Sequence, residues 1–323
     1  TNLFRDSYKR NAHTEFITGI LNKQIPKHTK LILNGEDLIS NHLAEDNDRR
    51  YFGINCPDGH STPNNIIKDV AACPKCGGRL EYEYIRYNHI GRAHCTNCDY
   101  GSPEMDYTIE SIDYANHRCQ VKTPEGSYDF KIIGENVTDI YNMITVIALL
   151  SELGLPIEKE QKSFEKMMIT ASRYDEKEVN GKKIVLNLAK GQNPIACSRV
   201  CDFIKHDSGK KAVICMIDDY YDARESSENI AWIYDIDFEF LKDDSIKQII
   251  ASGVRNQDFH LRLLMAGIPE ERVTCCEHEL ESASCVNLEA VDKIYLLYDV
   301  YTIQYAHQVC ENLEKMIQNG STK

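Results

Sequence analysis

The sequence predicts an α/β chain of two domains, the first of which carries an inserted metal-binding ribbon. Short apolar runs at residues 183–188, 212–217 and 293–298 are separated by helix-length segments, the pattern of βα units with a parallel sheet. Two Cys-x-x-Cys pairs lie in the first half of the chain, and they indicate a metal-binding ribbon that is inserted into the first domain. We expect domains over residues 1–175 and 176–323, with the ribbon at about 71–115 and a Rossmann-like unit in the second.

Each predicted element follows from a local pattern. Residues 30–34 form an apolar burst that reads as a buried parallel strand, and the polar loop Asn34-Gly-Glu-Asp37 follows at its carboxyl end, where α/β proteins place ligands. Apolar residues at helical spacing predict a helix over 139–153, which Gly154 and Pro156 terminate. The remaining expected elements are helices near 15–21 and 158–168 and strands at 51–54, 80–85, 107–113, 128–133 and 247–251.

The cysteine spacing predicts a structural zinc site. Cys73-Pro-Lys-Cys76 and Cys95-Thr-Asn-Cys98 form two knuckles, and Gly77 permits the left-handed turn that such a knuckle needs. Four protein thiolates fill a tetrahedral shell and leave no position for water or substrate, so the ion is expected to be structural. A pair of disulfides and a redox dithiol are the alternatives.

Charge and composition exclude several classes of protein. The formal net charge of −13 disfavours binding to a phosphate backbone, and with it a zinc-ribbon nucleic-acid binder. The sequence has thirteen cysteines but no visible signal peptide, and their only regular spacing is that of the two Cys-x-x-Cys pairs. These observations favour a reducing cytoplasm. The longest apolar run, residues 143–150, is too short to cross a bilayer, so no transmembrane segment is expected.

Several motifs together resemble the MurT-type subunits of lipid II isoglutaminyl synthases, which are relatives of the Mur ligases. The motifs occur in the order expected for that family and extend over nearly the whole chain. They are Asn2-Leu-Phe-Arg-Asp6, Leu33-Asn-Gly-Glu-Asp37, Tyr51-Phe-Gly-Ile54, the four-cysteine ribbon, Tyr141-Asn142, Trp232-Ile-Tyr-Asp-Ile-Asp-Phe-Glu239 and Ser252-Gly-Val-Arg255. The resemblance implies a Mur-ligase central domain with an inserted zinc ribbon and a C-terminal Mur-ligase domain.

The resemblance also implies a reaction, cofactors and partners. ATP and Mg²⁺ would convert the α-carboxylate of D-glutamate in the lipid II stem peptide to an acyl phosphate, which ammonia then displaces. A GatD-type glutaminase would supply the ammonia as the second subunit of a heterodimer, and lipid II would be met at the inner face of the membrane. The alternative is a non-catalytic interaction module that has lost ATP chemistry.

One expected motif is missing from the sequence. No Gly-x-x-x-x-Gly-Lys-Ser/Thr phosphate loop is present, although the family carries one N-terminal to the point where this sequence begins. Either an upstream segment is missing, as the absence of an initial Met suggests, or the chain is a variant without ATP chemistry.

Two aspartates are candidates for a catalytic role in the partner. In the family, an Asp of this subunit orients the glutaminase histidine as the third member of a triad. Asp235 is the first candidate and Asp222 the second. If residues 232–238 are extended, Asp235 and Asp237 lie on the same side of the run. For each, the alternative is a carboxylate that caps a helix or ends a strand.

Four further residues are candidates for cofactor binding by the same resemblance. Asn142 is expected to begin the amphipathic helix and to face the nucleotide, or only to make a helix-start hydrogen bond. Arg173 would contact phosphate between the domains, or be a solvated linker residue. Lys190 would contact an anion or be an ordinary surface lysine, and Asn2 would lie near Mg-ATP.

Overall fold

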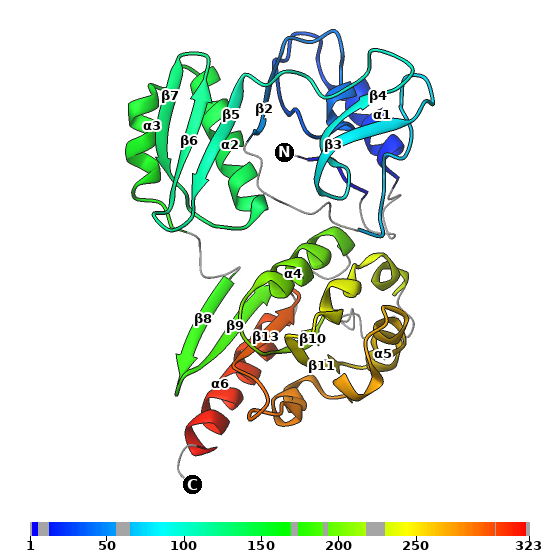
Figure 1. Cartoon of the computed structure of the whole chain (residues 1–323), viewed down its shortest axis with the longest axis vertical. Coiled ribbons are helices and arrows are strands. Elements are labelled where there is room, and N and C mark those ends of the chain that lie inside the picture. Colours follow the sequence, from blue (N-terminus) through cyan, green and yellow to red (C-terminus); the bar gives the residue numbers. More distant parts are fainter. Residues whose placement is uncertain are drawn as a thin grey trace. The chain divides into compact units, whose positions relative to one another are not determined.

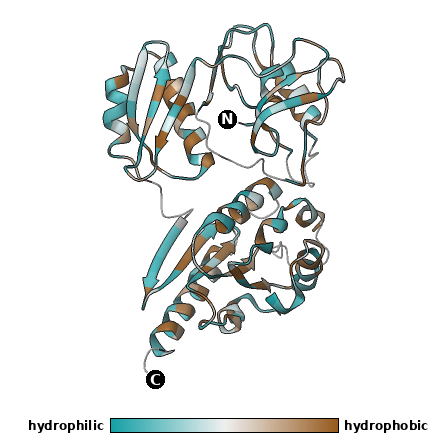
Figure 2. Cartoon of the chain, viewed as in Figure 1, coloured by the Kyte–Doolittle hydropathy of each residue, from teal (hydrophilic) through white to brown (hydrophobic). Residues whose placement is uncertain are grey.

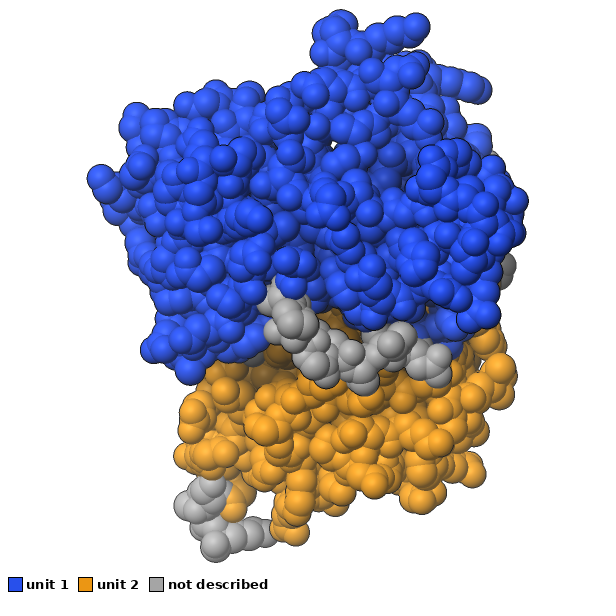
Figure 3. Space-filling view, turned by 45° about the horizontal axis from the view of Figure 1, so that its top comes forward, with its two compact units in different colours: residues 1–6, 11–169 blue, residues 7–10, 170–323 orange. Residues whose placement is uncertain are grey.

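The structure is a computed structural model that describes residues 2–5, 13–55, 65–168, 174–189, 193–217, 230–300 and 302–320. The chain separates into two compact units (Figure 3), with the described residues up to 168 in the first and those from 174 onward in the second. Each unit is described by itself.

The first unit is built on a five-stranded mixed sheet of order β1-β2-β5-β6-β7 (Figure 1). Strands β1, β2 and β5 are parallel, whereas β5, β6 and β7 form an antiparallel meander. Its elements are α1 (Thr14–Gln24), β1 (Leu31–Asn34), η1 (Ser40–His42), β2 (Arg49–Ile54), β3 (Leu80–Tyr87), β4 (Ile90–Cys95), β5 (Tyr107–Asp113), β6 (Arg118–Thr123), β7 (Gly126–Lys131), α2 (Val137–Glu152) and α3 (Ile157–Phe164).

Helix α2 covers the parallel part of this sheet. Ile140, Ile144 and Ile147 recur at helical spacing and are buried in the same core as strand residues of β2 and β5. The Asn136 side chain caps the helix, since its Oδ1 accepts the Asp139 N–H at 2.9 Å. The expectation that Asn142 begins this helix is therefore wrong: α2 begins at Val137, and Asn142 is exposed in its second turn.

The segment between β2 and β5 contains the cysteine ribbon. Strands β3 and β4 form a two-stranded antiparallel sheet of their own, and isolated bridges join Ile90 of β4 to Asp37 and His94 of β4 to Gly101. Leu38 and Ile39, from the loop after β1, share a small core with Val70, Leu80 and other ribbon residues. The ribbon is thereby attached to the carboxyl end of β1.

The second unit is built on a six-stranded sheet of order β12-β11-β10-β13-β9-β8, in which only the edge strand β8 is antiparallel. Its core strands are mostly hydrophobic and β8 is mostly hydrophilic (Figure 2). Its elements are β8 (Tyr174–Val179), β9 (Lys182–Leu188), α4 (Pro194–His206), β10 (Lys211–Met216), η2 (Ala231–Asp235), η3 (Phe238–Lys242), β11 (Ile246–Ser252), α5 (Asn256–Met265), η4 (Glu270–Arg272), β12 (Val273–Cys276), η5 (Glu279–Cys285), β13 (Lys293–Tyr298) and α6 (Ile303–Gly320).

The run around Asp235 differs from the extended segment considered above. Residues 231–235 and 238–242 form two short 3₁₀ helices, and Trp232 and Ile233 fill the core beneath α4 and α5. Asp235 is consequently half-exposed whereas Asp237 is buried. The two carboxylates do not share the environment that an extended run would give them.

Candidate functional site

The four ribbon cysteines converge on one point. Their sulfur atoms all lie within 4.8 Å of one another, with Cys73 Sγ to Cys98 Sγ at 3.7 Å and Cys76 Sγ to Cys95 Sγ at 3.5 Å. A tetrahedral ion with metal–sulfur bonds of about 2.3 Å places its ligands about 3.8 Å apart, so the observed separations fit such an ion. The residues therefore form a candidate metal centre.

The local backbone explains why these knuckles close. Gly77 adopts a positive φ of 72°, which permits the turn after Cys76, and its N–H donates to the Cys73 carbonyl at 2.8 Å. In the second knuckle the Asn97 N–H donates to Cys95 Sγ at 3.4 Å. Because four thiolates complete a tetrahedron, the site can hold a structural ion and offers no open position for chemistry.

The carboxyl end of β1 carries a buried carboxylate. Glu36 is fully buried and pairs with Arg86, whose Nε lies 2.7 Å from Glu36 Oε1. Its other oxygen accepts the Ile54 N–H at 2.8 Å and the Tyr141 hydroxyl at 2.9 Å. Burial, together with the Glu36 charge, raises the pKa of Tyr141 well above its usual value, so the phenol stays protonated and donates.

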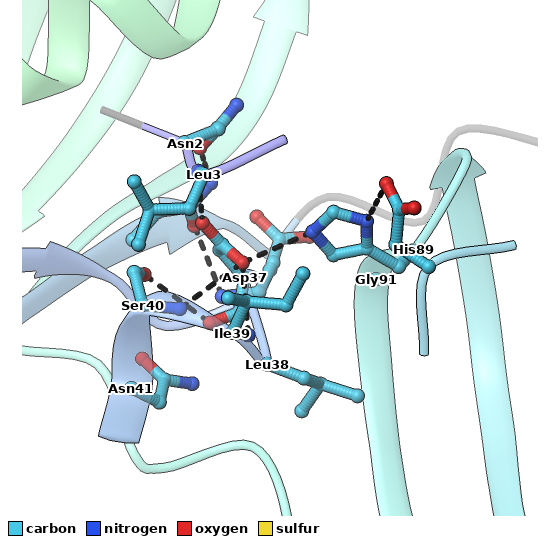
Figure 4. A network of polar contacts seen from close by, with 12 residues as sticks. Asn2, Leu3, Asp37, Leu38, Ile39, Ser40, Asn41, His89 and Gly91 are labelled. Carbon is cyan, nitrogen blue, oxygen red and sulfur yellow. Dashed lines mark hydrogen bonds and ion pairs between the residues drawn. The ribbon is translucent and has the colours of Figure 1, made fainter. Parts of the chain in front are cut away.

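The neighbouring carboxylate, Asp37, links the ribbon to the N-terminal segment (Figure 4). Its Oδ1 lies 3.1 Å from His89 Nε2, and its Oδ2 accepts the Leu3 N–H at 2.7 Å. Oδ1 also accepts the Ile39 N–H at 3.0 Å, which fixes the loop that follows. Because a carboxylate can only accept, His89 Nε2 is the donor in this contact.

Asn2 is held at the same end of the sheet. Asn34 Nδ2 donates to Asn2 Oδ1 at 2.7 Å, and Asn2 Nδ2 donates to the Tyr87 hydroxyl at 2.6 Å. Asn2, Asn34, Glu36 and Asp37 therefore gather where strand β1 ends, the usual place for ligands in an open α/β sheet. Asn34, Glu36 and Asp37 are fully buried and hydrogen-bonded, so the half-buried Asn2 amide is the group of this cluster that can face a polar ligand.

The other predicted site residues do not join this cluster in the described structure. Asn142 is exposed on α2, and Asp235 lies half-exposed at the end of η2 in the second unit. Asp222, Arg173 and Lys190 lie outside the described residues. Four cysteines and Asn2 are thus the sequence-predicted residues that have described neighbours at a candidate site.

Sequence reasoning missed the partners that surround these residues. The loop that contains Glu36 and Asp37 was recognised as a ligand loop, but Arg86, His89 and Asp69 were not. The sequence did contain one signal, the histidine at position 89 in the turn between two strands, where a solvent-exposed polar residue is usual. His89 is instead only 1% exposed, and Asp37 lies 52 residues away in the sequence.

Comparison with known sequences gives three findings. Residues 190–303 match the protein-family model described as "MurT ligase C-terminal". A Staphylococcus aureus protein named "Lipid II isoglutaminyl synthase (glutamine-hydrolyzing) subunit MurT" is 31% identical over 271 residues, which cover 83% of this chain and 60% of that protein. A Streptococcus pneumoniae protein of the same name is 27% identical over 281 residues, 85% of this chain and 60% of that protein.

Comparison with solved structures identifies the fold. A pseudomurein peptide ligase type C from Methanothermus fervidus superposes with a TM-score of 0.70 at 18% identity, covering 97% of this chain and 62% of that one. MurF from Acinetobacter baumannii gives a TM-score of 0.59 at 13% identity, over 95% of this chain and 55% of that one. MurF from Thermotoga maritima, solved in complex with ADP, gives 0.55 at 12% identity, over 94% and 57%.

The chain therefore has a Mur-ligase-like α/β fold with mixed sheets. Its sequence is similar to those of two MurT subunits, as the sequence motifs indicated, and its residues 190–303 match the MurT C-terminal model. It spans 60% of the length of the curated relatives that it matches. Among the described residues, no helix is both long and apolar enough to cross a membrane.

Proposed function

We propose that the chain is part of the ligase subunit of a glutamine-dependent amidotransferase that acts on the D-glutamate α-carboxylate of the lipid II stem peptide in peptidoglycan synthesis. The observation that carries this proposal is the 31% identity to a MurT subunit over 83% of the chain. The match to the MurT ligase C-terminal model, which begins at residue 190, supports it. The comparisons do not favour the alternative of a non-catalytic interaction module.

The proposed chemistry has a clear physical basis. A carboxylate is a poor electrophile, so its oxygen attacks the γ-phosphorus of ATP, ADP leaves, and an acyl phosphate forms on the substrate. Ammonia then attacks the carbonyl carbon, phosphate leaves, and the nitrogen loses a proton to give the amide. Only unprotonated ammonia is a nucleophile, which is why a closed path from a GatD-type glutaminase suits the reaction.

We assign roles to this chain's residues within that proposal. Asn2, beside the carboxylates at the end of β1, would contact Mg-ATP, and Arg173 and Lys190 would contact phosphate. Asn142 is exposed on α2 and available to a nucleotide. Asp235, or failing that Asp222, would orient the histidine of the glutaminase, and the half-exposed position of Asp235 is compatible with contact to another subunit.

The four-cysteine centre is proposed to hold Zn²⁺ in a structural role. The thiolate-only donor set and the sulfur separations of 3.5 and 3.7 Å support this metal. We further propose the domain limits 1–175 and 176–323 with the ribbon at about 71–115. The second domain is proposed to be Rossmann-like, because five of its six strands are parallel and helices connect them.

A reconstitution assay tests the function. The full-length protein, with and without a GatD-type glutaminase, is incubated with lipid II, Mg-ATP and either glutamine or ammonium chloride, and the product is analysed by mass spectrometry. We expect conversion of one carboxyl to a carboxamide with ADP release, from glutamine only when the partner is present. Absence of ATP binding and of product under both nitrogen sources would favour the interaction module.

A further inference from the structure

The tip of the ribbon hairpin contacts the N-terminal segment on two sides. Tyr87, at the end of β3, accepts the Asn2 side-chain N–H at 2.6 Å, and His89, in the turn, pairs with Asp37, whose other oxygen accepts the Leu3 N–H. The Phe4 ring lies between the same two side chains, with ring centroids 5.8 Å from Tyr87 and 4.8 Å from His89. The hairpin tip therefore contacts Asn2 and Phe4 directly and Leu3 through Asp37.

A second carboxylate completes the arrangement. Arg5 Nε donates to Asp69 Oδ1 at 2.7 Å, and Asp69 Oδ2 lies 4.0 Å from His89 Nδ1. Asp69 and His89 are 4% and 1% exposed in their side chains, so their mutual contact is shielded from water, whereas the Arg5 side chain is 30% exposed. Charged and polar groups at such burial retain much more of their interaction energy than exposed pairs do.

These contacts determine which way the Asn2 amide faces. Asn34 Oδ1 accepts the Glu36 N–H at 3.0 Å, so the Asn34 nitrogen is the group that donates to Asn2 Oδ1. Asn2 must then turn its own nitrogen toward the Tyr87 hydroxyl. One N–H and one lone pair of the Asn2 amide are left over, in an orientation that β1 and the hairpin set together.

The opposite end of the hairpin holds the cysteine centre. Strand β3 is eight residues long, which corresponds to about 26 Å at the usual rise per residue, so the two ends are well separated. Between them, the Gly91 N–H donates to the Glu36 carbonyl at 2.9 Å and the Tyr100 hydroxyl donates to the Leu38 carbonyl at 2.7 Å. The loop after β1 thus lies along the ribbon from the tip toward the metal centre.

We propose that the hairpin tip is a clamp for residues 2–5, in which Tyr87 and His89 are positioning residues. His89 fixes the Asp37 carboxylate that receives the Leu3 amide, and Tyr87 fixes the Asn2 side chain. The clamp gives the metal ribbon a role in the ligand site at the end of β1, without any direct contribution of the ion to chemistry. The ligand that Asn2 is positioned to contact, Mg-ATP, follows from the proposed function.

The test uses two variants of the full-length protein and two measurements. In His89→Leu the imidazole donor is lost, and we expect the exchange of the Leu3 amide, followed by NMR with ¹⁵N-leucine labelling, to accelerate at least tenfold. In Tyr87→Phe only one oxygen is removed, and we expect the Kd for Mg-ATP to rise about tenfold, because the Asn2 amide loses its fixed orientation. Both variants should keep their bound metal, since the tip is remote from the cysteines.

Controls separate positioning from general loosening. His89→Gln restores a side-chain N–H and should recover most of the Leu3 protection, whereas Glu83→Gln, an exposed change on β3, should alter neither measurement. If His89→Leu does not fold, the Mg-ATP affinity of Tyr87→Phe tests the proposal by itself. Unchanged Leu3 exchange in a folded, metal-loaded His89→Leu protein, or unchanged Mg-ATP affinity in Tyr87→Phe, would overturn the proposal.

The two proposals fail in different ways. Wild-type protein that binds no Mg-ATP but shows fast Leu3 exchange in His89→Leu would refute the nucleotide role of Asn2 and support the clamp. Wild-type protein that binds Mg-ATP, with both variants indistinguishable from it, would refute the clamp and leave the proposed function standing.

Discussion

Glu36 and Arg86 form a buried ion pair that joins the end of β1 to the ribbon, with a 2.7 Å contact and side-chain exposures of 0% and 6%. The pair is also hydrogen-bonded on its flanks: Glu36 accepts from Ile54 and Tyr141, and an Arg86 N–H donates to the Ile54 carbonyl. Either charge alone would be costly to bury, because the attraction between the two offsets the desolvation penalty of each.

Removal of one partner of this pair is predicted to be strongly destabilising. Arg86→Met leaves the Glu36 carboxylate buried without its counter-charge, and we expect the free energy of unfolding of the first unit to fall by about 3 kcal/mol or more. Urea denaturation measures this loss. The double variant Arg86→Met with Glu36→Gln should lose less than the sum of the single variants, and strict additivity would contradict the coupling.

Loss of one cysteine ligand is predicted to release the metal and to loosen the ribbon. Cys76→Ser leaves three thiolates, so the ion should be lost and amide protection over residues 73–98 should fall, because metal binding and local folding are coupled. Elemental analysis and hydrogen exchange measure the two effects. Cys285→Ser, a half-exposed cysteine of the second unit, is the matched control and should keep the metal.

Glu160 is predicted to make stability depend on pH. Burial raises the pKa of this carboxyl from 4.5 to about 7, against the opposing effect of the Ser151 hydroxyl at 3.1 Å. The folded state therefore binds the proton more tightly, and its stability falls as the pH rises from about 4.5 to about 7. At pH values above the folded-state pKa of about 7, the total loss in the free energy of unfolding is up to about 3 kcal/mol.

The substitution Glu160→Gln isolates this contribution. It removes the titrating group, so we expect the variant to lose less stability than the wild type between pH 4.5 and 7.5, as measured by thermal unfolding at each pH. Glu158→Gln, an exposed change in the same helix α3, should follow the wild type. Parallel pH profiles for wild type and Glu160→Gln would show that the carboxyl titrates normally.

The aspartate role is predicted to be specific to glutamine hydrolysis. In the complex with a glutaminase, Asp235→Asn should lower glutamine hydrolysis about a thousandfold, because a triad orienter fixes the histidine tautomer. The amidation step supplied with ammonium chloride should continue, and metal content should not change. Asp244→Asn, an exposed change nearby in sequence, is the control. Unchanged hydrolysis would transfer the role to Asp222.

Much of the fold could be predicted because its strands are apolar runs with clear ends. The predicted strands at 107–113, 183–188 and 293–298 correspond closely to β5, β9 and β13. Strands β6 and β8 were missed, since Arg118-Cys-Gln-Val-Lys-Thr and Tyr174-Asp-Glu-Lys-Glu-Val carry too few apolar residues to stand out, and β12 (Val273–Cys276) was missed because it has only four residues. The apolar run at Trp232, for which an extended conformation was considered, packs as a 3₁₀ turn, because tertiary burial overrides local preference there.

The site divides in the same way. The cysteine cluster could be predicted because two short spacings encode it, and the three-dimensional structure brings both knuckles together. The partners of Asp37 could not, since Leu3 and His89 lie 34 and 52 residues away and no local pattern signals either contact. Pairings of this kind become visible only when the chain is folded.

Strand β8 closes the sheet of the second unit with charged side chains. Lys177 pairs with Glu314 of α6 and Glu176 with Lys183 of β9, each at 2.6 Å, and no further strand pairs with β8 among the described residues. A foreign β-strand that aligned with this edge would have to strip water from these charges. Aggregation by strand addition is thereby discouraged, and concentrated solutions of the protein should stay clear at low ionic strength.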